Sequence, residues 1–160
     1  MEIKQRVAFI NIAVNQRVEY VPDPLSAPGG DIWSTPCETL ARGAGDCEDF
    51  AITKFFLLLA SGGPQNGVRL LYARHSRVDR PAAPVPHMVV VAQWPLIDPL
   101  VLDCITPLLV TLSHRDDLQP VFSFDQSSIW PRVDAVPLSP VRSRISSWRT
   151  ALARTARQLH

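Results

Sequence analysis

The stretch GAGDCEDFAITKFFLLLASGG, residues 43–63, indicates the fold more strongly than any other part of this chain. It predicts a helix over residues 47–61, because Asp46 is a favourable N-cap residue and two glycines end the apolar run. Glu48 and Asp49 suit the positive end of the helix dipole. Apolar side chains point in nearly all directions around this helix, so we expect it to be buried through the middle of a domain.

Segments on either side of this helix predict further elements. Residues 2–18 carry apolar side chains at spacings of three and four, which predicts an amphipathic helix within an N-terminal part of residues 1–20. Residues 20–45 are rich in proline and glycine and predict a long loop. Four strands are then expected, at Val68–Ala73, His87–Trp94, Leu100–Cys104 and Val121–Phe124. A basic helical tail is expected over residues 140–160, and such a basic face is usually solvated, with an anionic membrane or a receptor as the alternative contact.

The order of these elements predicts the fold class. Strands that follow one another without intervening helices favour an antiparallel sheet. We therefore expect a single α+β domain over residues 1–160, with the helical N-terminal part packed on an antiparallel sheet.

The composition is that of a globular protein. The chain has 160 residues, of which 46% are hydrophobic and 19% charged, and its net charge of +1 gives no argument for nucleic acid or membrane as a partner. No apolar run is long enough to form a transmembrane helix. The N-terminus lacks the apolar core of a signal peptide, so we expect either a cytoplasmic protein or a chain whose leader is missing.

Three cysteines leave at least one thiol free unless it pairs with another chain, and the absence of a CxxC pair argues against structural zinc.

Three residues have the types and positions of a cysteine-hydrolase site. Cys47 begins the predicted buried helix, where the helix N-terminus favours the thiolate and backbone N–H groups can stabilise an oxyanion. His87 opens a predicted strand and can act as general base and acid. Asp103 ends the next strand, and an antiparallel hairpin brings that end close to His87, where a carboxylate can fix the imidazole tautomer.

Each of these residues also has a purely structural interpretation. A cysteine at a helix start is commonly a small buried residue, a histidine before a strand a surface polar group, and an aspartate after a strand a turn residue. The combination favours catalysis, but the residues alone leave both interpretations open.

Five segments together resemble a known family. They are residues 31–40, 45–54, 87–91, 101–103 and 115–124. In this order they resemble the bacterial transglutaminase-like cysteine proteinases, and the block GDCEDFAITK at residues 45–54 is the most specific of them. The resemblance implies a papain-like, transglutaminase-type fold with Cys47 as nucleophile, His87 as base and Asp103 as orienting acid.

The resemblance also implies calcium dependence, with Asp46, Glu48 and Asp49 as ligands beside the nucleophile. Carboxylates around a thiol oppose thiolate formation, and a cation held by oxygen ligands offsets that charge. Helix capping and dipole complementarity explain the same acidic residues without a metal, and no EF-hand spacing is present.

Family members imply further properties of this chain. A periplasmic member cleaves a large cell-surface adhesin and so releases cells from biofilm, and a membrane receptor that senses cyclic di-GMP sequesters that protease. A transglutaminase or amidase using the same three residues, or a catalytically silent binding module, are the alternatives. Two departures stand out: Cys104 replaces the usual Asn after the catalytic Asp, and the Pro- and Ala-rich segment 79–86 precedes His87 as a candidate rim that alters substrate choice.

Overall fold

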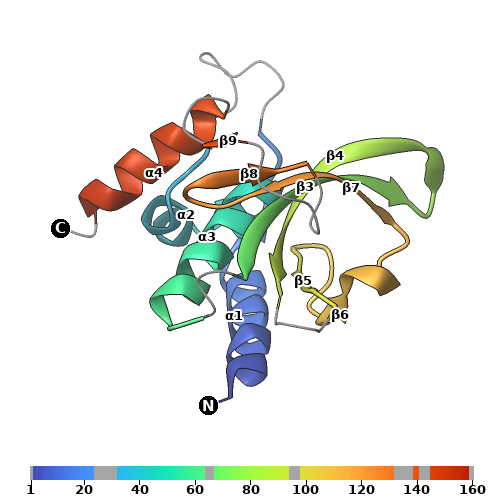
Figure 1. Cartoon of the computed structure of the whole chain (residues 1–160), viewed down its shortest axis with the longest axis horizontal. Helices are drawn as coiled ribbons and strands as arrows, with labels where there is room; N and C mark the ends of the chain where they lie inside the picture. Colours follow the sequence, from blue (N-terminus) through green and yellow to red (C-terminus); the bar gives the residue numbers. More distant parts are fainter. Residues whose placement is uncertain are drawn as a thin grey trace.

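The computed structural model describes most of the chain. The described residues are 2–23, 32–63, 67–93, 98–131, 139–140 and 145–158. Figure 1 shows the helices gathered on one side of a curved antiparallel sheet, with the N-terminus at the free end of α1. The elements are α1 (Ile3–Arg17), β1 (Glu19–Tyr20), α2 (Pro36–Arg42), β2 (Ala44–Gly45), α3 (Cys47–Ala60), β3 (Val68–Arg77), β4 (Arg80–Ala92), β5 (Leu100–Leu102), β6 (Val110–Thr111), the 3₁₀ turn η1 (Leu112–His114), β7 (Leu118–Phe124), β8 (Ser128–Trp130), β9 (Ser139–Pro140) and α4 (Ser146–Gln158).

The main sheet has the strand order β6-β5-β4-β3-β7-β8-β9, and each neighbouring pair is antiparallel. The β3–β4 hairpin forms its centre and extends furthest from the helices (Figure 1). The two-residue strands β1 and β2 pair in parallel just before α3. The predicted α+β fold with an antiparallel sheet is confirmed.

Helix α3 is buried between the other helices and the sheet, as its sequence predicts. The Asp46 side chain caps it by accepting a hydrogen bond from the Asp49 amide. Phe50, Ile52 and Leu58 on different faces of the helix are almost fully buried. This burial on all sides is what its uniformly apolar composition requires.

Helices α1 and α4 flank α3. Val7 and Val14 of α1 are buried, whereas Ile3, at the start of the predicted apolar face, is exposed. In α4 the fully buried Trp148 packs edge-to-face on Phe55, with ring centroids 5.7 Å apart. The predicted C-terminal helix is confirmed over α4, whereas residues 141–144 and 159–160 of the predicted tail lie outside the described part.

The prediction of an uninterrupted loop over residues 20–45 is wrong, because α2 lies within it. Thr35 and Glu38 form a capping box, and Pro36 occupies the first turn. This S/T-x-x-E pattern with a following proline is a helix-start signal that the overall proline and glycine content obscured. Residues 24–31 lie outside the described residues.

The strand boundaries also differ from those predicted. Strand β4 begins at Arg80, so the proline-rich segment continues the β3–β4 hairpin. Prolines are tolerated there because β5 joins β4 only at Val90–Ala92 and leaves the other edge of this part unpaired. The two- and three-residue strands β6, β8 and β9 were not predicted, because such short segments carry no measurable alternation.

The sheet has apolar residues on both faces. One face packs against α3, and the other forms a smaller core of Leu71, Ala73, Val89, Val91, Val101 and Leu118. Ala73 of β3 pairs directly with His87 of β4. Within the described residues, no helix is both long and apolar enough to cross a bilayer.

Candidate active site

The thiol of Cys47 lies at the first turn of α3 and is almost fully buried. Gly45 makes the tight approach to this turn possible, because a Cβ on it would lie 2.6 Å from Asp49 side-chain atoms. The Cys47 Sγ donates a hydrogen bond to Glu48 Oε2 at 3.0 Å. The backbone of Met88, the residue after His87 on β4, lowers the pKa of this thiol and so lies near it.

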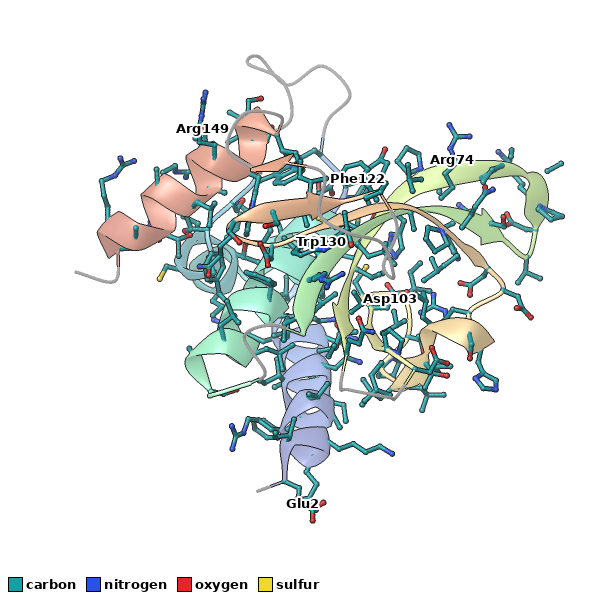
Figure 2. All side chains as sticks on the ribbon, viewed as in Figure 1. Glu2, Arg74, Asp103, Phe122, Trp130 and Arg149 are labelled. Atoms are coloured by element: carbon teal, nitrogen blue, oxygen red, sulfur yellow. The ribbon has the colours of Figure 1, made fainter. Side chains whose placement is uncertain are left out.

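His87 and Asp103 form a buried pair. His87 Nε2 lies 2.8 Å from Asp103 Oδ1, and both side chains are shielded from solvent. Val90 of β4 pairs with Leu102 of β5, so the residue after β5 reaches the part of β4 that carries His87. Figure 2 shows Asp103 in the interior beside the curved sheet, whereas Arg74 lies at the periphery. The structure thus brings together the imidazole and carboxylate that the sequence singled out.

The carboxylate of Asp103 is held in its ionised form. Burial by itself raises the pKa of Asp103, but the hydrogen bond and charge of His87, then the hydrogen bond of Arg115, outweigh it and hold the pKa well below its usual range. Arg115 Nη2 donates to Asp103 Oδ2 at 2.7 Å, and the Ile105 amide donates to Oδ1 at 3.1 Å. Because the ionised carboxylate only accepts, His87 carries its proton on Nε2 and leaves Nδ1 free to act as a base.

Lys54 also belongs to this centre, although sequence analysis assigned it no role. Its ammonium is fully buried and donates to Asn11 Oδ1 at 2.8 Å, Asn15 Oδ1 at 2.6 Å and the Asp103 backbone oxygen at 2.9 Å. Burial lowers the pKa of Lys54 to about 8. A lysine on an otherwise apolar helix was the available signal, since a buried ammonium requires several acceptors.

The acidic residues around Cys47 fall into two groups. Burial, together with the charge of and hydrogen bond with Glu48, raises the pKa of Asp46 to about 7. Asp49 instead accepts from the Ser34 amide at 3.0 Å and forms an ion pair with Arg42 at 2.9 Å. Of the three predicted metal ligands, Asp46 and Glu48 therefore face each other, and Asp49 is bonded elsewhere.

These carboxylates change the expected chemistry of the thiol. The helix N-terminus was expected to lower the pKa of Cys47, but burial first, then the charge and hydrogen bond of Glu48, raise it far above its usual range. Burial first, then the charges of Cys47 and Cys104, raise the pKa of the nearby Tyr20 to about 12. Local negative charge thus outweighs the helix dipole at this site.

Solved structures resemble this chain over nearly its whole length. Legionella pneumophila LapG in an EGTA-treated form is 31% identical, with a TM-score of 0.81, over 96% of this chain and 80% of that chain. The chain belongs to the LapG family. A calcium-bound form of Legionella pneumophila LapG is also 31% identical, with a TM-score of 0.78 over 96% of this chain and 80% of that one. No family model and no curated protein matches the chain.

Membership of the LapG family confirms the resemblance that the sequence suggested, to transglutaminase-like cysteine proteinases. The family resemblance rests on the GDCEDFAITK block, and in the structure this block supplies the nucleophile candidate, the acidic pair and Lys54. The segment of the sequence that is most specific for the family thus supplies several side chains of the candidate site.

Cys104 lies inside this LapG-family site. One donor atom each from His87, Asp103 and Cys104 lie within 4.8 Å of one another. Burial, then the charge of Asp103, raise the pKa of the Cys104 thiol to about 12. Because the cations of Lys54 and Arg115 also contact Asp103, this cluster is a poor place for a metal cation.

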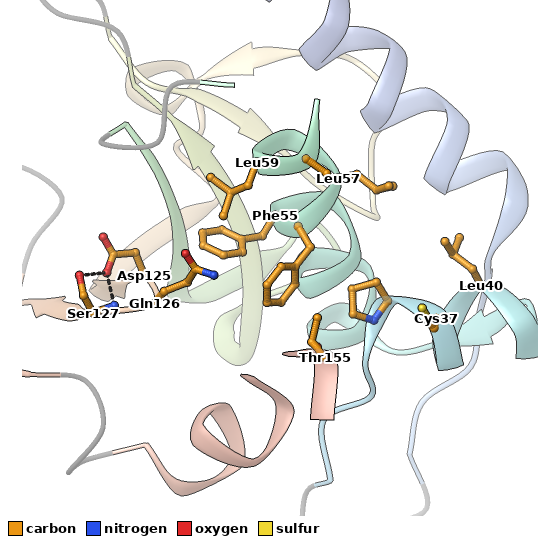
Figure 3. Close-up of a pocket in the computed structure, with 12 residues that line it drawn as sticks. Cys37, Leu40, Phe55, Leu57, Leu59, Asp125, Gln126, Ser127 and Thr155 are labelled. Carbon is orange, nitrogen blue, oxygen red and sulfur yellow. Dashed lines mark hydrogen bonds between the residues drawn. The ribbon is translucent and has the colours of Figure 1, made fainter. Parts of the chain in front are cut away.

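A separate apolar cavity of about 630 Å³ lies at the other end of α3 (Figure 3). Phe55, Leu59 and Cys37 line it, together with the turn between β7 and β8. No residue of the Cys47–His87–Asp103 group lines it, so this cavity is not the candidate active site.

Proposed function

We propose that this LapG-family chain is a calcium-dependent cysteine endopeptidase in which Cys47, His87 and Asp103 form the catalytic triad. The observation that carries the proposal is the buried His87–Asp103 hydrogen bond of 2.8 Å, on a strand whose next residue, Met88, acts through its backbone on the Cys47 thiol at the start of α3. Burying an ion pair costs desolvation energy, so such a pair is weak evidence for stability. Buried charge partners of this kind cluster at functional sites.

Each group has a defined part in the reaction. Cys47 Sγ attacks the carbonyl carbon of the scissile peptide, and His87 Nδ1 accepts the thiol proton and then gives it to the leaving amine. Asp103 holds the imidazole tautomer and stabilises the imidazolium. The Cys47 amide lies at the first turn of α3, where the helix supplies no acceptor, so it can donate to the oxyanion. Water activated by His87 then hydrolyses the thioester.

The acidic pair fits a calcium ion. Asp46 and Glu48 offer carboxylate oxygens, which are the ligands that Ca²⁺ takes, and burial first, then the charge of Glu48, raise the pKa of Asp46. Bound calcium would neutralise the charge beside Cys47 and favour its thiolate. Asp49 is left out of this ligand set, because Ser34 and Arg42 already occupy its two oxygens.

Family membership supports a substrate and a location. We propose that the substrate is a large cell-surface adhesin whose cleavage controls biofilm attachment, that the chain acts in the periplasm, and that a cyclic di-GMP-responsive membrane receptor is a partner. Legionella pneumophila LapG has been solved both calcium-bound and EGTA-treated, which supports calcium as the ion to test.

The first test measures alkylation of each cysteine by iodoacetamide at mildly acidic pH, with calcium and with EGTA. With calcium bound, which would offset the Glu48 charge that raises the pKa of Cys47, we expect Cys47 to react far faster than exposed Cys37 and half-buried Cys104, because an ordinary thiol is protonated at this pH. Calcium should accelerate only Cys47. Equal alkylation rates at all three cysteines would contradict the triad, and a Cys47 rate that is the same in calcium and in EGTA would contradict the calcium site.

A second test identifies the reaction. Incubation with an adhesin fragment should create new N-termini with wild type and with Cys37→Ala, an exposed cysteine, but none with Cys47→Ala. Ammonia release with cross-links would instead indicate transamidation, and binding unchanged by Cys47→Ala without any product would indicate a silent binding module.

A further inference from the structure

Arg115 is buried behind the His87–Asp103 pair and is itself held by Asp117. Arg115 Nε donates to Asp117 Oδ1 at 2.8 Å, and Nη2 donates to Asp117 Oδ2 at 2.8 Å. The same Nη2 donates to Asp103 Oδ2 at 2.7 Å. One edge of the guanidinium therefore serves Asp117, and Asp103 receives a single donor from it.

This division of donors affects the hydrogen bond between Asp103 Oδ1 and His87 Nε2, the proposed base. A guanidinium and a carboxylate prefer two parallel hydrogen bonds, and Arg115 Nη1 is buried without a partner among the described residues. If Arg115 turned to offer two donors to Asp103, Oδ1 would be drawn away from His87 Nε2. The hydrogen bonds that Arg115 Nε and Nη2 donate to Asp117 oppose that rotation.

We propose that Asp117 is a positioning residue of this centre: by holding Arg115 on two donors, it restricts Arg115 to Oδ2 of Asp103 and keeps Oδ1 for His87. This inference rests on the proposed function of the triad. Among the described residues, Asp117 makes no hydrogen bond or ion pair with His87 or Cys47; its side chain contacts Arg115 and His75, and it acts on Asp103 through Arg115.

The fold keeps Asp117 in place from the opposite side. His75 Nε2 lies 3.2 Å from Asp117 Oδ2, and the Ser76 amide donates to the Asp117 backbone oxygen at 2.8 Å. The His75 ring also lies 5.4 Å from the His87 ring, because the two are diagonal neighbours on paired strands. Side chains from β3, β4, and the segments after β5 and before β7 thus form one closed group.

The test uses two readouts that need no substrate: the low-field NMR signal of the His87 Nε2 proton and the alkylation rate of Cys47 at saturating calcium. For Asp117→Ala we expect the His87 proton signal to shift upfield or vanish and the alkylation rate of Cys47 to fall about tenfold. Removing one member of a coupled network of polar groups weakens more than one hydrogen bond. Asp117→Asn, which keeps one acceptor, should give an intermediate loss. Asp79→Ala is the matched control, since Asp79 makes the same two-bond pair with Arg77 at an exposed site.

A double-mutant cycle separates positioning from general support of the fold. In an Arg115→Ala background, Asp117→Ala should change the rate less than twofold, because its target is gone. Equal losses in both backgrounds, or an unchanged proton signal in folded Asp117→Ala, would overturn the inference while leaving the triad intact. Failure of wild-type Cys47 to react faster than Cys37 would instead overturn the triad itself.

Discussion

Replacing Lys54 by methionine tests the buried polar network under Asp103. Methionine keeps much of the length of the side chain but removes all three hydrogen bonds, to Asn11, Asn15 and the Asp103 backbone oxygen. At pH 7 hydrogen bonds donated by a charged group contribute about 1.5–3 kcal/mol each. The charged lysine also carries an ionisation cost, because burial lowers its pKa from 10.5 to about 8, and at 1.36 kcal/mol for each pH unit this is about 3 kcal/mol. The hydrogen bonds outweigh the ionisation cost, so we expect Lys54→Met to lower the free energy of unfolding by about 2–6 kcal/mol at pH 7.

The change of the stability difference between wild type and Lys54→Met with pH tests this explanation most directly. Below pH 8 the lysine is protonated in both states and its cost is fully present. Between pH 8 and 10.5 the unfolded chain holds a proton that the folded chain has released, so the stability of the wild type rises with pH. The variant has no such group. Its disadvantage relative to wild type should therefore grow by about 2–3 kcal/mol between pH 7 and pH 10.

Urea unfolding followed by tryptophan fluorescence at several pH values measures this difference. Other groups that titrate in this range, such as Tyr20, are present in both proteins and cancel. Lys4→Met, at an exposed position of α1, is the control and should show a constant difference. A difference for Lys54→Met that stays constant or shrinks as pH rises would refute the reasoning.

Three further changes test the site and the core. Asp103→Asn should slow alkylation of Cys47 about a hundredfold or more, because an amide no longer fixes the His87 tautomer; near-wild-type rates would contradict its orienting role. Glu48→Gln should raise the alkylation rate in EGTA several-fold and reduce the response to calcium, because the Glu48 charge raises the pKa of the neighbouring thiol; an unchanged response to calcium would remove Glu48 from the ligand set. Trp148→Ala should destabilise the protein by about 3–5 kcal/mol in urea unfolding, since this side chain is fully buried; a loss below 1 kcal/mol would show that α4 is not part of the cooperative fold.

The sequence by itself determined the features that depend on neighbouring residues. The Asp46 cap, the length of α3 and the position of Cys47 at its first turn follow from residues within one or two helical turns. The hairpin that brings Asp103 to His87 follows from strand alternation and a short connection. Where a local signal was overlooked, as with the Thr35–Glu38 capping box of α2, the information was present but was hidden by composition.

Only the tertiary structure decided the partners of the charged groups. Arg115 and Lys54 reach Asp103 from other segments of the chain, and Asp49, although predicted to be a metal ligand, forms an ion pair with Arg42. The high pKa of the Cys47 thiol likewise depends on burial, which no local pattern specifies. Capping and periodicity are short-range effects of the backbone, whereas desolvation and ion pairing depend on which surfaces meet after the chain has folded.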